Sequence, residues 1–134
     1  MPRIITVTTG GADYLCHVSD GEHEWTIDEP LEAGGGNTAH DPYGALLASL
    51  GSCSAITLCM YARRKGWNVS GVTVQLSLQR QDTGAEKSTL IRRSLGIRGD
   101  LDDTQRARLA QIVAACPVSR ILEGSIRIET VDHS

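Results

Sequence analysis

The order of apolar and polar residues predicts three short strands at the start of the chain, over residues 3–8, 13–18 and 23–28. Gly10-Gly11 and Asp20-Gly21 lie between these runs, and Asp-Gly is a typical hairpin turn. We therefore expect an antiparallel meander. Residues 30–41 follow as a loop, in which the triple glycine 34–36 indicates flexibility rather than a phosphate site, because no Lys-Ser/Thr pair follows it.

A long helix is predicted from Pro42 to Lys65. Asp41 is a suitable N-cap, proline is favoured at the first helical position, and Gly66 ends the run. An apolar stripe runs along this segment, through Leu46, Leu50, Cys53, Thr57 and Met60. This broad stripe predicts a largely buried helix, and the small residues around Cys53 permit another element to approach closely.

The second half of the chain predicts a hairpin, a helix and a closing strand. Its strands are expected over residues 69–79 and 89–98, and over 124–130. Asp100 is expected to cap the helix, whose apolar face is predicted to carry Leu109, Ile112, Val113 and Cys116, with Pro117 ending it. The fold class is therefore α+β in the order β-β-β-α-β-β-α-β, with two buried helices packed on antiparallel sheet in one domain, residues 1–134.

Composition excludes several function classes. Aromatic residues make up 4% of the chain and phenylalanine is missing, so a base-stacking surface for nucleic acid is not expected. No run of 18 apolar residues occurs and no signal-peptide pattern opens the chain, so we expect no membrane span and a cytoplasmic location. The acids dominate residues 1–62 and the bases residues 63–134. This uneven charge has two explanations. The two parts form different surfaces of one domain, or the acidic and basic halves of the chain meet, within one chain or across a dimer.

The four cysteines carry the candidate chemistry. Cys16 and Cys59 are interpreted as packing residues, and neither a CxxC motif nor histidine spacing indicates a metal site. Cys53 and Cys116 lie on apolar faces of different helices, so they are either core residues or a redox pair. A Cys–His hydrolase using His40 stays open, although no oxyanion signature supports it.

Two stretches give a resemblance to a known family. Residues 41–67, with LGSC around Cys53, and residues 99–124, with CPVS around Cys116, resemble the OsmC/Ohr family of osmotically inducible and organic hydroperoxide resistance proteins. The resemblance implies an intertwined homodimer without a bound cofactor, with active sites near the subunit interface. It also implies that Cys53 reduces organic hydroperoxides, that Cys116 resolves the sulfenic acid as a disulfide, and that an external dithiol of lipoyl type reduces that disulfide.

The sequence departs from the family pattern at two places. Hydroperoxide-reducing members carry a glutamate where this chain has Tyr43 or Gly44, and an N-terminal arginine, whereas no Arg or Lys occurs here between Arg3 and Arg63. Because Cys53 lies about three turns into its helix, a nearby cation is expected to support its thiolate, and Arg120 is the candidate. The departures favour an alternative, a redox-sensing or ligand-binding dimer with little turnover.

Overall fold

The computed structural model describes residues 3–132 and residue 134. Contacts divide the chain into two compact units, residues 1–48 and 49–134, which are described one at a time. Helix α1 (Pro42–Lys65) begins in the first unit and continues into the second. Each unit contains an antiparallel sheet, which confirms the α+β class. The expectation of a single domain over 1–134 stays a prediction.

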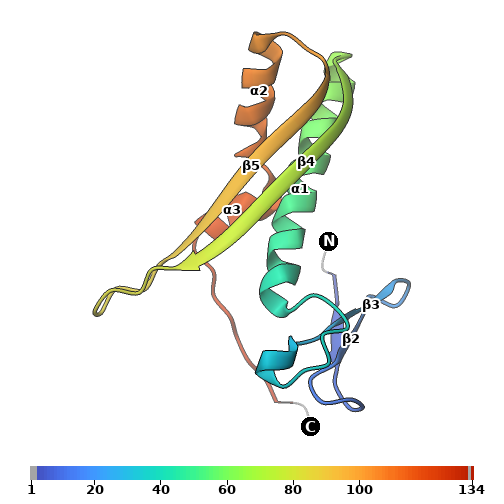
Figure 1. Cartoon of the computed structure of the whole chain (residues 1–134), viewed down its shortest axis with the longest axis vertical. Coiled ribbons are helices and arrows are strands. Elements are labelled where there is room, and N and C mark those ends of the chain that lie inside the picture. Colours follow the sequence, from blue (N-terminus) through green and yellow to red (C-terminus); the bar gives the residue numbers. More distant parts are fainter. Residues whose placement is uncertain (1–2, 133) are drawn as a thin grey trace. The chain divides into compact units, whose positions relative to one another are not determined.

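The first unit contains the expected meander. Strands β1 (Thr6–Thr8), β2 (Cys16–Ser19) and β3 (Glu24–Ile27) pair antiparallel in the order β1-β2-β3 (Figure 1). The strands are shorter than predicted: residues 3–5 lie outside β1, and the turns between the strands take up other flanking residues. The prediction of three strands is thus confirmed, with corrected ends.

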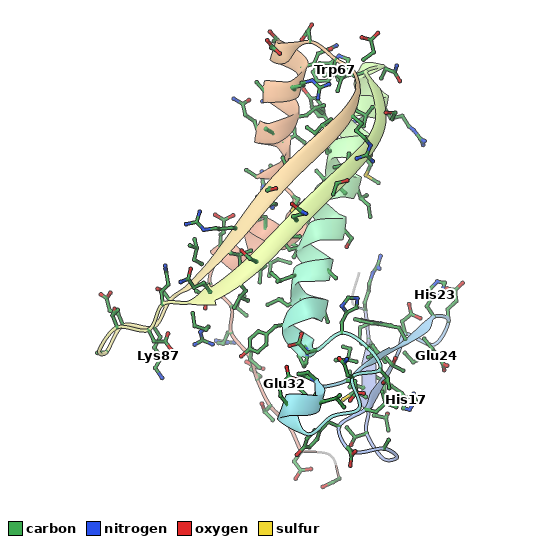
Figure 2. All side chains as sticks on the ribbon, in the orientation of Figure 1. His17, His23, Glu24, Glu32, Trp67 and Lys87 are labelled. Carbon is green, nitrogen blue, oxygen red and sulfur yellow. The ribbon has the colours of Figure 1, made fainter. Side chains whose placement is uncertain are left out.

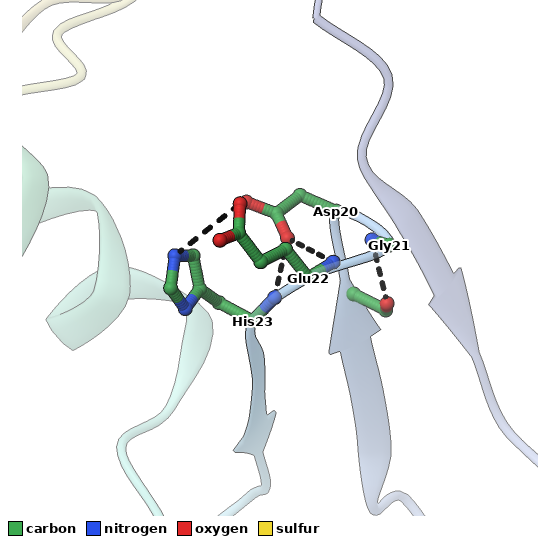
Figure 3. Close-up of polar contacts among 5 residues, drawn as sticks. Asp20, Gly21, Glu22 and His23 are labelled. Atoms are coloured by element: carbon green, nitrogen blue, oxygen red, sulfur yellow. Dashed lines mark hydrogen bonds and ion pairs between the residues drawn. The ribbon is translucent and has the colours of Figure 1, made fainter.

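The turn between β2 and β3 is built on the predicted Asp-Gly pair. The carboxylate of Asp20 accepts hydrogen bonds from the backbone N–H groups of Glu22 at 2.9 Å and His23 at 2.6 Å (Figure 3). The hydrogen bond from His23, and to a smaller extent the one from Glu22, lowers the pKa of Asp20. Gly21 has a φ of 93°, a conformation that a side chain would disfavour. Figure 3 also shows the imidazole of His23 facing Glu22, 3.9 Å apart.

The loop after β3 contains a short helix and several hydrogen bonds. It contains the short 3₁₀ helix η1 (Leu31–Ala33), and the buried carboxylate of Asp28 accepts bonds from the backbone and hydroxyl of Thr38. A Cβ on Gly35 would collide with the backbone of Glu29. Close packing of the loop is therefore a reason for glycine at this position, and the flexibility of the loop stays a prediction.

Helix α1 has the predicted ends. Asp41 accepts a hydrogen bond from the backbone N–H of Gly44 at 2.8 Å, and Gly66 follows the helix with a φ of 69°. The buried stripe differs from the predicted one, since it consists of Leu50, Gly51, Ser54, Leu58 and Ala62. Met60 is 63% exposed, because only one side of α1 is covered within its unit. Among the described residues, α1 is the one helix whose length and composition would also suit a membrane span, a property shared by core helices of soluble proteins.

The second unit is organised around a long two-stranded ribbon. Strands β4 (Asn68–Arg80) and β5 (Thr89–Asp100) pair antiparallel, as predicted (Figure 1). The core forms where α1 and α2 (Asp103–Val113) meet the ribbon, through Leu58, Ala62, Leu109 and Val113. Trp67 packs at the edge of this core, whereas Lys87 lies in the turn at the opposite end of the ribbon (Figure 2).

Three predictions for the end of the chain need correction. Asp102, not Asp100, caps α2. It forms a capping box with Gln105, while Asp100 pairs with Asn68 in the ribbon. The helix ends at Val113, and a third helix, α3 (Pro117–Glu123), begins at the proline that was expected to end the second. Proline lacks an N–H, so it suits a first helical position as well as a stop.

The predicted closing strand is also missing. Residues 125–132 of the described chain have no regular structure, and Ile126 and Ile128 in this segment are 55% and 85% exposed. The alternating pattern that predicted a strand is present, but in the part of the chain that the structure describes these residues pair with no strand.

Candidate functional site

The second unit brings the two candidate cysteines together. Cys53 lies in the middle of α1 and is half-buried, whereas Cys116 is the N-cap residue of α3 and is fully buried. The hydroxyl of Ser54, next to Cys53 in sequence, lies 3.8 Å from the sulfur of Cys116. The thiol of Cys53 itself lowers the pKa of Cys116 through a hydrogen bond. Both cysteines are free in the structure.

An arginine that the sequence analysis did not single out completes the cluster. Nη1 of Arg93 donates to the hydroxyl of Ser54 at 3.0 Å and to that of Ser119 at 3.4 Å. The same nitrogen lies 4.0 Å from the sulfur of Cys116. One guanidinium group on β5 therefore contacts α1, the N-cap of α3 and its first turn.

A sequence signal for Arg93 does exist. In β5, half-buried residues alternate with exposed ones, and the half-buried residues form the inner face of the strand. Arg93 lies on this face between Ile91 and Leu95. Its partner in the ribbon is the apolar Leu76. A charged residue in a row of core positions needs a polar partner. The polar partners of Arg93 include Ser54 and Cys116, so this pattern is a sequence signal for the site.

Close packing of α1 on the ribbon holds this arrangement. A Cβ on Gly51 would lie 2.7 Å from the Cδ1 of Leu76, so no larger residue fits without movement of that side chain. Leu76 is paired with Arg93. The predicted role of the small residues near Cys53, allowing close approach of another element, is confirmed at this position.

The hydroxyl of Ser54 connects Arg93 and Cys116 chemically. It is fully buried and donates its proton to the carbonyl of Leu50 at 2.7 Å, while accepting from Arg93. A serine hydroxyl has a single proton that rotates between acceptors. When Cys116 is a thiol, its S–H can donate to this oxygen. When Cys116 is a thiolate, the hydroxyl can turn its proton toward the sulfur.

These contacts favour the charged form of Cys116. Burial alone would raise the pKa of the thiol. The backbone N–H of Ser119, the Ser54 hydroxyl, the Cys53 thiol and the charge of Arg93 outweigh this effect and lower the pKa of Cys116. The site therefore favours the thiolate form of Cys116, with the second cysteine next to it.

A cavity of 340 Å³ lies beside the cluster. The polar part of its lining is Thr89, Arg93, Ser119 and Glu123, and the rest is apolar, formed by Leu50, Leu90, Ile91 and Leu122. The Ser119 hydroxyl donates to the carboxylate of Glu123 at 3.0 Å. An arginine and a glutamate are thus linked through a serine next to Cys116, although neither stands at the family's expected position.

The other candidate residues lie elsewhere. Arg120 is exposed on α3 and has no hydrogen bond from its side chain within the described chain, so its proposed support of Cys53 remains a prediction. Cys59 is exposed, which corrects its interpretation as a core residue. Cys16 is half-buried and contacts the carbonyl of Tyr14. Over residues 3–132 and 134, no group of three or more His, Cys, Asp or Glu residues could hold a metal.

The fold and the site together define a class of small α+β proteins with two helix-borne cysteines. Residues 34–131 match the family described as OsmC-like protein. The match covers most of the chain, so this protein belongs to the OsmC family. No curated protein matches the sequence.

Solved structures support the same assignment of the fold. An OsmC-like protein from Mycoplasma pneumoniae superposes with a TM-score of 0.78 at 19% identity, covering 92% of this chain and 89% of that one. The organic hydroperoxide resistance protein OsmC from Legionella pneumophila gives 0.69 at 18% identity, with 92% and 90% covered. The organic hydroperoxide resistance protein OhrB of Bacillus subtilis gives 0.62 at 20% identity, with 92% of each chain covered.

Proposed function

We propose that this protein is a thiol-dependent peroxidase that reduces organic hydroperoxides to alcohols. The observation that carries the proposal is the pairing of Cys53 with Cys116, whose pKa is lowered by hydrogen bonds from Ser119, Ser54 and Cys53 and by the charge of Arg93. Family membership and structural neighbours named organic hydroperoxide resistance proteins support the same activity.

The proposed reaction begins at Cys53, the more accessible of the two thiols. Its thiolate attacks one peroxide oxygen, the O–O bond breaks, and the alkoxide takes a proton to leave as an alcohol. Cys53 is then a sulfenic acid. The Cys116 thiolate attacks the Cys53 sulfur, the hydroxide leaves as water after protonation, and a disulfide forms.

The substrate class follows from the cavity next to the cluster. Its leucine and isoleucine side chains offer an apolar surface for an alkyl or aryl group, while Arg93 provides charge at one end. Hydrogen peroxide has no apolar group to bind there. We therefore propose a preference for organic over inorganic peroxide.

An external dithiol completes the proposed cycle, with a lipoyl-type dithiol as the expected reductant and no bound cofactor. The proposed location is the cytoplasm, where thiols such as these four are kept reduced.

A homodimer is also proposed. One side of α1 exposes Ile56, Cys59 and Met60 around a groove of 730 Å³. The strand-like segment with Ile126 and Ile128 also pairs with no strand among the residues described, 3–132 and 134. A second copy that covers α1 and pairs with this segment would bury both apolar surfaces. Light scattering on the purified protein tests this; a monomer at micromolar concentration would contradict it.

Steady-state turnover tests the proposed function. With dithiothreitol as reductant, cumene hydroperoxide should be consumed catalytically, and hydrogen peroxide at least about tenfold more slowly. Cys53→Ser should abolish the reaction. Oxidation limited to one equivalent, with no turnover, would favour the alternative of a redox-sensing dimer.

A further inference from the structure

The surroundings of the two sulfurs differ in a way that concerns the reductive half of the cycle. The sulfur of Cys116 lies 4.0 Å from the Nη1 of Arg93 and 3.8 Å from the Ser54 hydroxyl, and the residue is fully buried. Cys53 is only half-buried. One sulfur is thus surrounded by groups that stabilise negative charge, and the other is the one that solvent molecules can reach.

Thiol–disulfide exchange depends on both properties. The attacking thiolate must reach one sulfur of the disulfide in line with the S–S bond, and the other sulfur must leave as a thiolate. A leaving sulfur with a stabilised negative charge leaves faster. In this site, access favours attack on Cys53, and the positive charge favours departure of Cys116.

We propose that Arg93 makes Cys116 the leaving group when the disulfide is reduced, so that the external dithiol enters through the sulfur of Cys53. This inference rests on the proposed Cys53–Cys116 disulfide and adds a direction and a residue to it. Arg93 then acts in the reduction of the disulfide. It lies on β5, whereas the arginine of hydroperoxide-reducing family members lies in the N-terminal region.

The electron balance is simple. A thiolate of the dithiol attacks the Cys53 sulfur, the Cys53–Cys116 bond breaks, and Cys116 leaves as a thiolate beside Arg93. The second thiol of the reductant, once deprotonated, attacks the reductant's own sulfur in the mixed disulfide and releases Cys53 as a thiolate. The dithiol is oxidised to a disulfide by two electrons, and the protein regains both thiols.

Ser54 and Ser119 position the guanidinium for this step. Both hydroxyls accept hydrogen bonds from the same Nη1, at 3.0 Å and 3.4 Å, and Glu123 accepts in turn from Ser119. The nitrogen is therefore held between the end of α3 that carries Cys116 and the turn of α1 that carries Cys53. Arg92, the preceding residue, is exposed and is paired with Ser77, so it offers a matched control.

The test starts from a disulfide made with diamide, so that it does not depend on peroxidase activity. The oxidised protein is treated briefly with the monothiol 2-mercaptoethanol, quenched with acid, alkylated and analysed by peptide mass spectrometry. We expect the mixed disulfide on Cys53 and the alkylated thiol on Cys116. A mixed disulfide on Cys116, or failure of diamide to link the two cysteines, would overturn the inference.

The rate of reduction tests Arg93. Reduction by dithiothreitol at neutral pH should be about threefold to tenfold slower in Arg93→Met than in the wild type, unchanged in Arg92→Met, and largely restored in Arg93→Lys. Equal rates in Arg93→Met and Arg92→Met would overturn the role of Arg93. Arg93→Gln replaces Arg93→Met if that variant does not fold, and the mapping of the adduct needs no variant.

The two proposals fail in different ways. If peroxide consumption is absent but the diamide-made disulfide opens at Cys53, the proposed function is wrong and the inference about exchange stands. If peroxide is consumed but the adduct forms on Cys116, the proposed function stands and the inference about exchange is wrong.

Discussion

Nη1 of Arg93 lies 3.0 Å from the Oγ of Ser54, the residue that follows Cys53 in α1. This contact joins the middle of β5 to the turn of the helix that carries the first cysteine. Because the same nitrogen is 4.0 Å from the sulfur of Cys116, the contact fixes a positive charge beside that sulfur. Removing either end of the contact should therefore change the chemistry of a cysteine that is not itself altered.

Ser54→Ala removes the hydroxyl that accepts from Arg93 and faces Cys116. We expect a loss of about 1 kcal/mol in the free energy of unfolding, because the hydroxyl is buried and hydrogen-bonded. Disulfide formation after peroxide should also slow. Ser52→Ala is the control, since its exposed hydroxyl contacts only the carbonyl of Ser49. Equal effects of the two substitutions in urea unfolding and in stopped-flow oxidation would contradict this account.

The lowered pKa of Cys116 predicts a pH-dependent stability. The folded, reduced protein should bind fewer protons at Cys116 than the unfolded chain does. Stability relative to Cys116→Ser should therefore rise with pH up to the unfolded value of about 8.5, and fall as pH drops through the folded pKa. Urea unfolding of both reduced proteins over this range measures the difference. A difference that does not vary with pH would contradict the assignment.

Arg93→Met should raise the pKa of Cys116, because it removes the charge that favours the thiolate. Ultraviolet absorbance of the thiolate, taken as the difference from a protein that also carries Cys116→Ser, reports this pKa. Arg120→Met provides the comparison. Arg120 is exposed and touches Cys116 only through a backbone hydrogen bond of 3.1 Å, and its side chain has no hydrogen-bond partner among the described residues, so its loss should leave the titration of Cys116 unchanged. A shift caused by Arg120→Met and not by Arg93→Met would reverse the assignment.

The corrected start of α2 is also testable. Asp102→Ala removes the capping box with Gln105 and should cost about 1 kcal/mol. Asp100→Ala, at the position that the sequence first indicated, should cost less than about 0.5 kcal/mol, because Asp100 is exposed at the end of β5. Thermal unfolding of both variants distinguishes the two caps.

Much of the fold follows from local patterns. The three N-terminal strands, the ends of α1 at Pro42 and Gly66, and the long ribbon were all predicted, because turn residues and alternation act over a few positions. The segment 124–130 has the pattern of a strand but pairs with no strand in the described part of the chain. Its pairing depends on a contact that a single sequence does not specify.

The site was predictable in part. Cys53 and Cys116 were found from their motifs, and the structure brings them together. Arg93 was missed because its position depends on the register of β5 against Leu76, and only that register places it on the inner face beside Ser54. Cys116 was assigned to the end of the second helix because Pro117 can either end a helix or begin one.

The most direct test of the account is peptide mass spectrometry of the reduced protein after one equivalent of cumene hydroperoxide. We predict a Cys53–Cys116 disulfide within seconds, with Cys16 and Cys59 still free, and in Cys116→Ser a sulfenic acid on Cys53 that dimedone traps. A sulfenic acid on Cys116 in Cys53→Ser, or oxidation spread over all four cysteines without this disulfide, would contradict it.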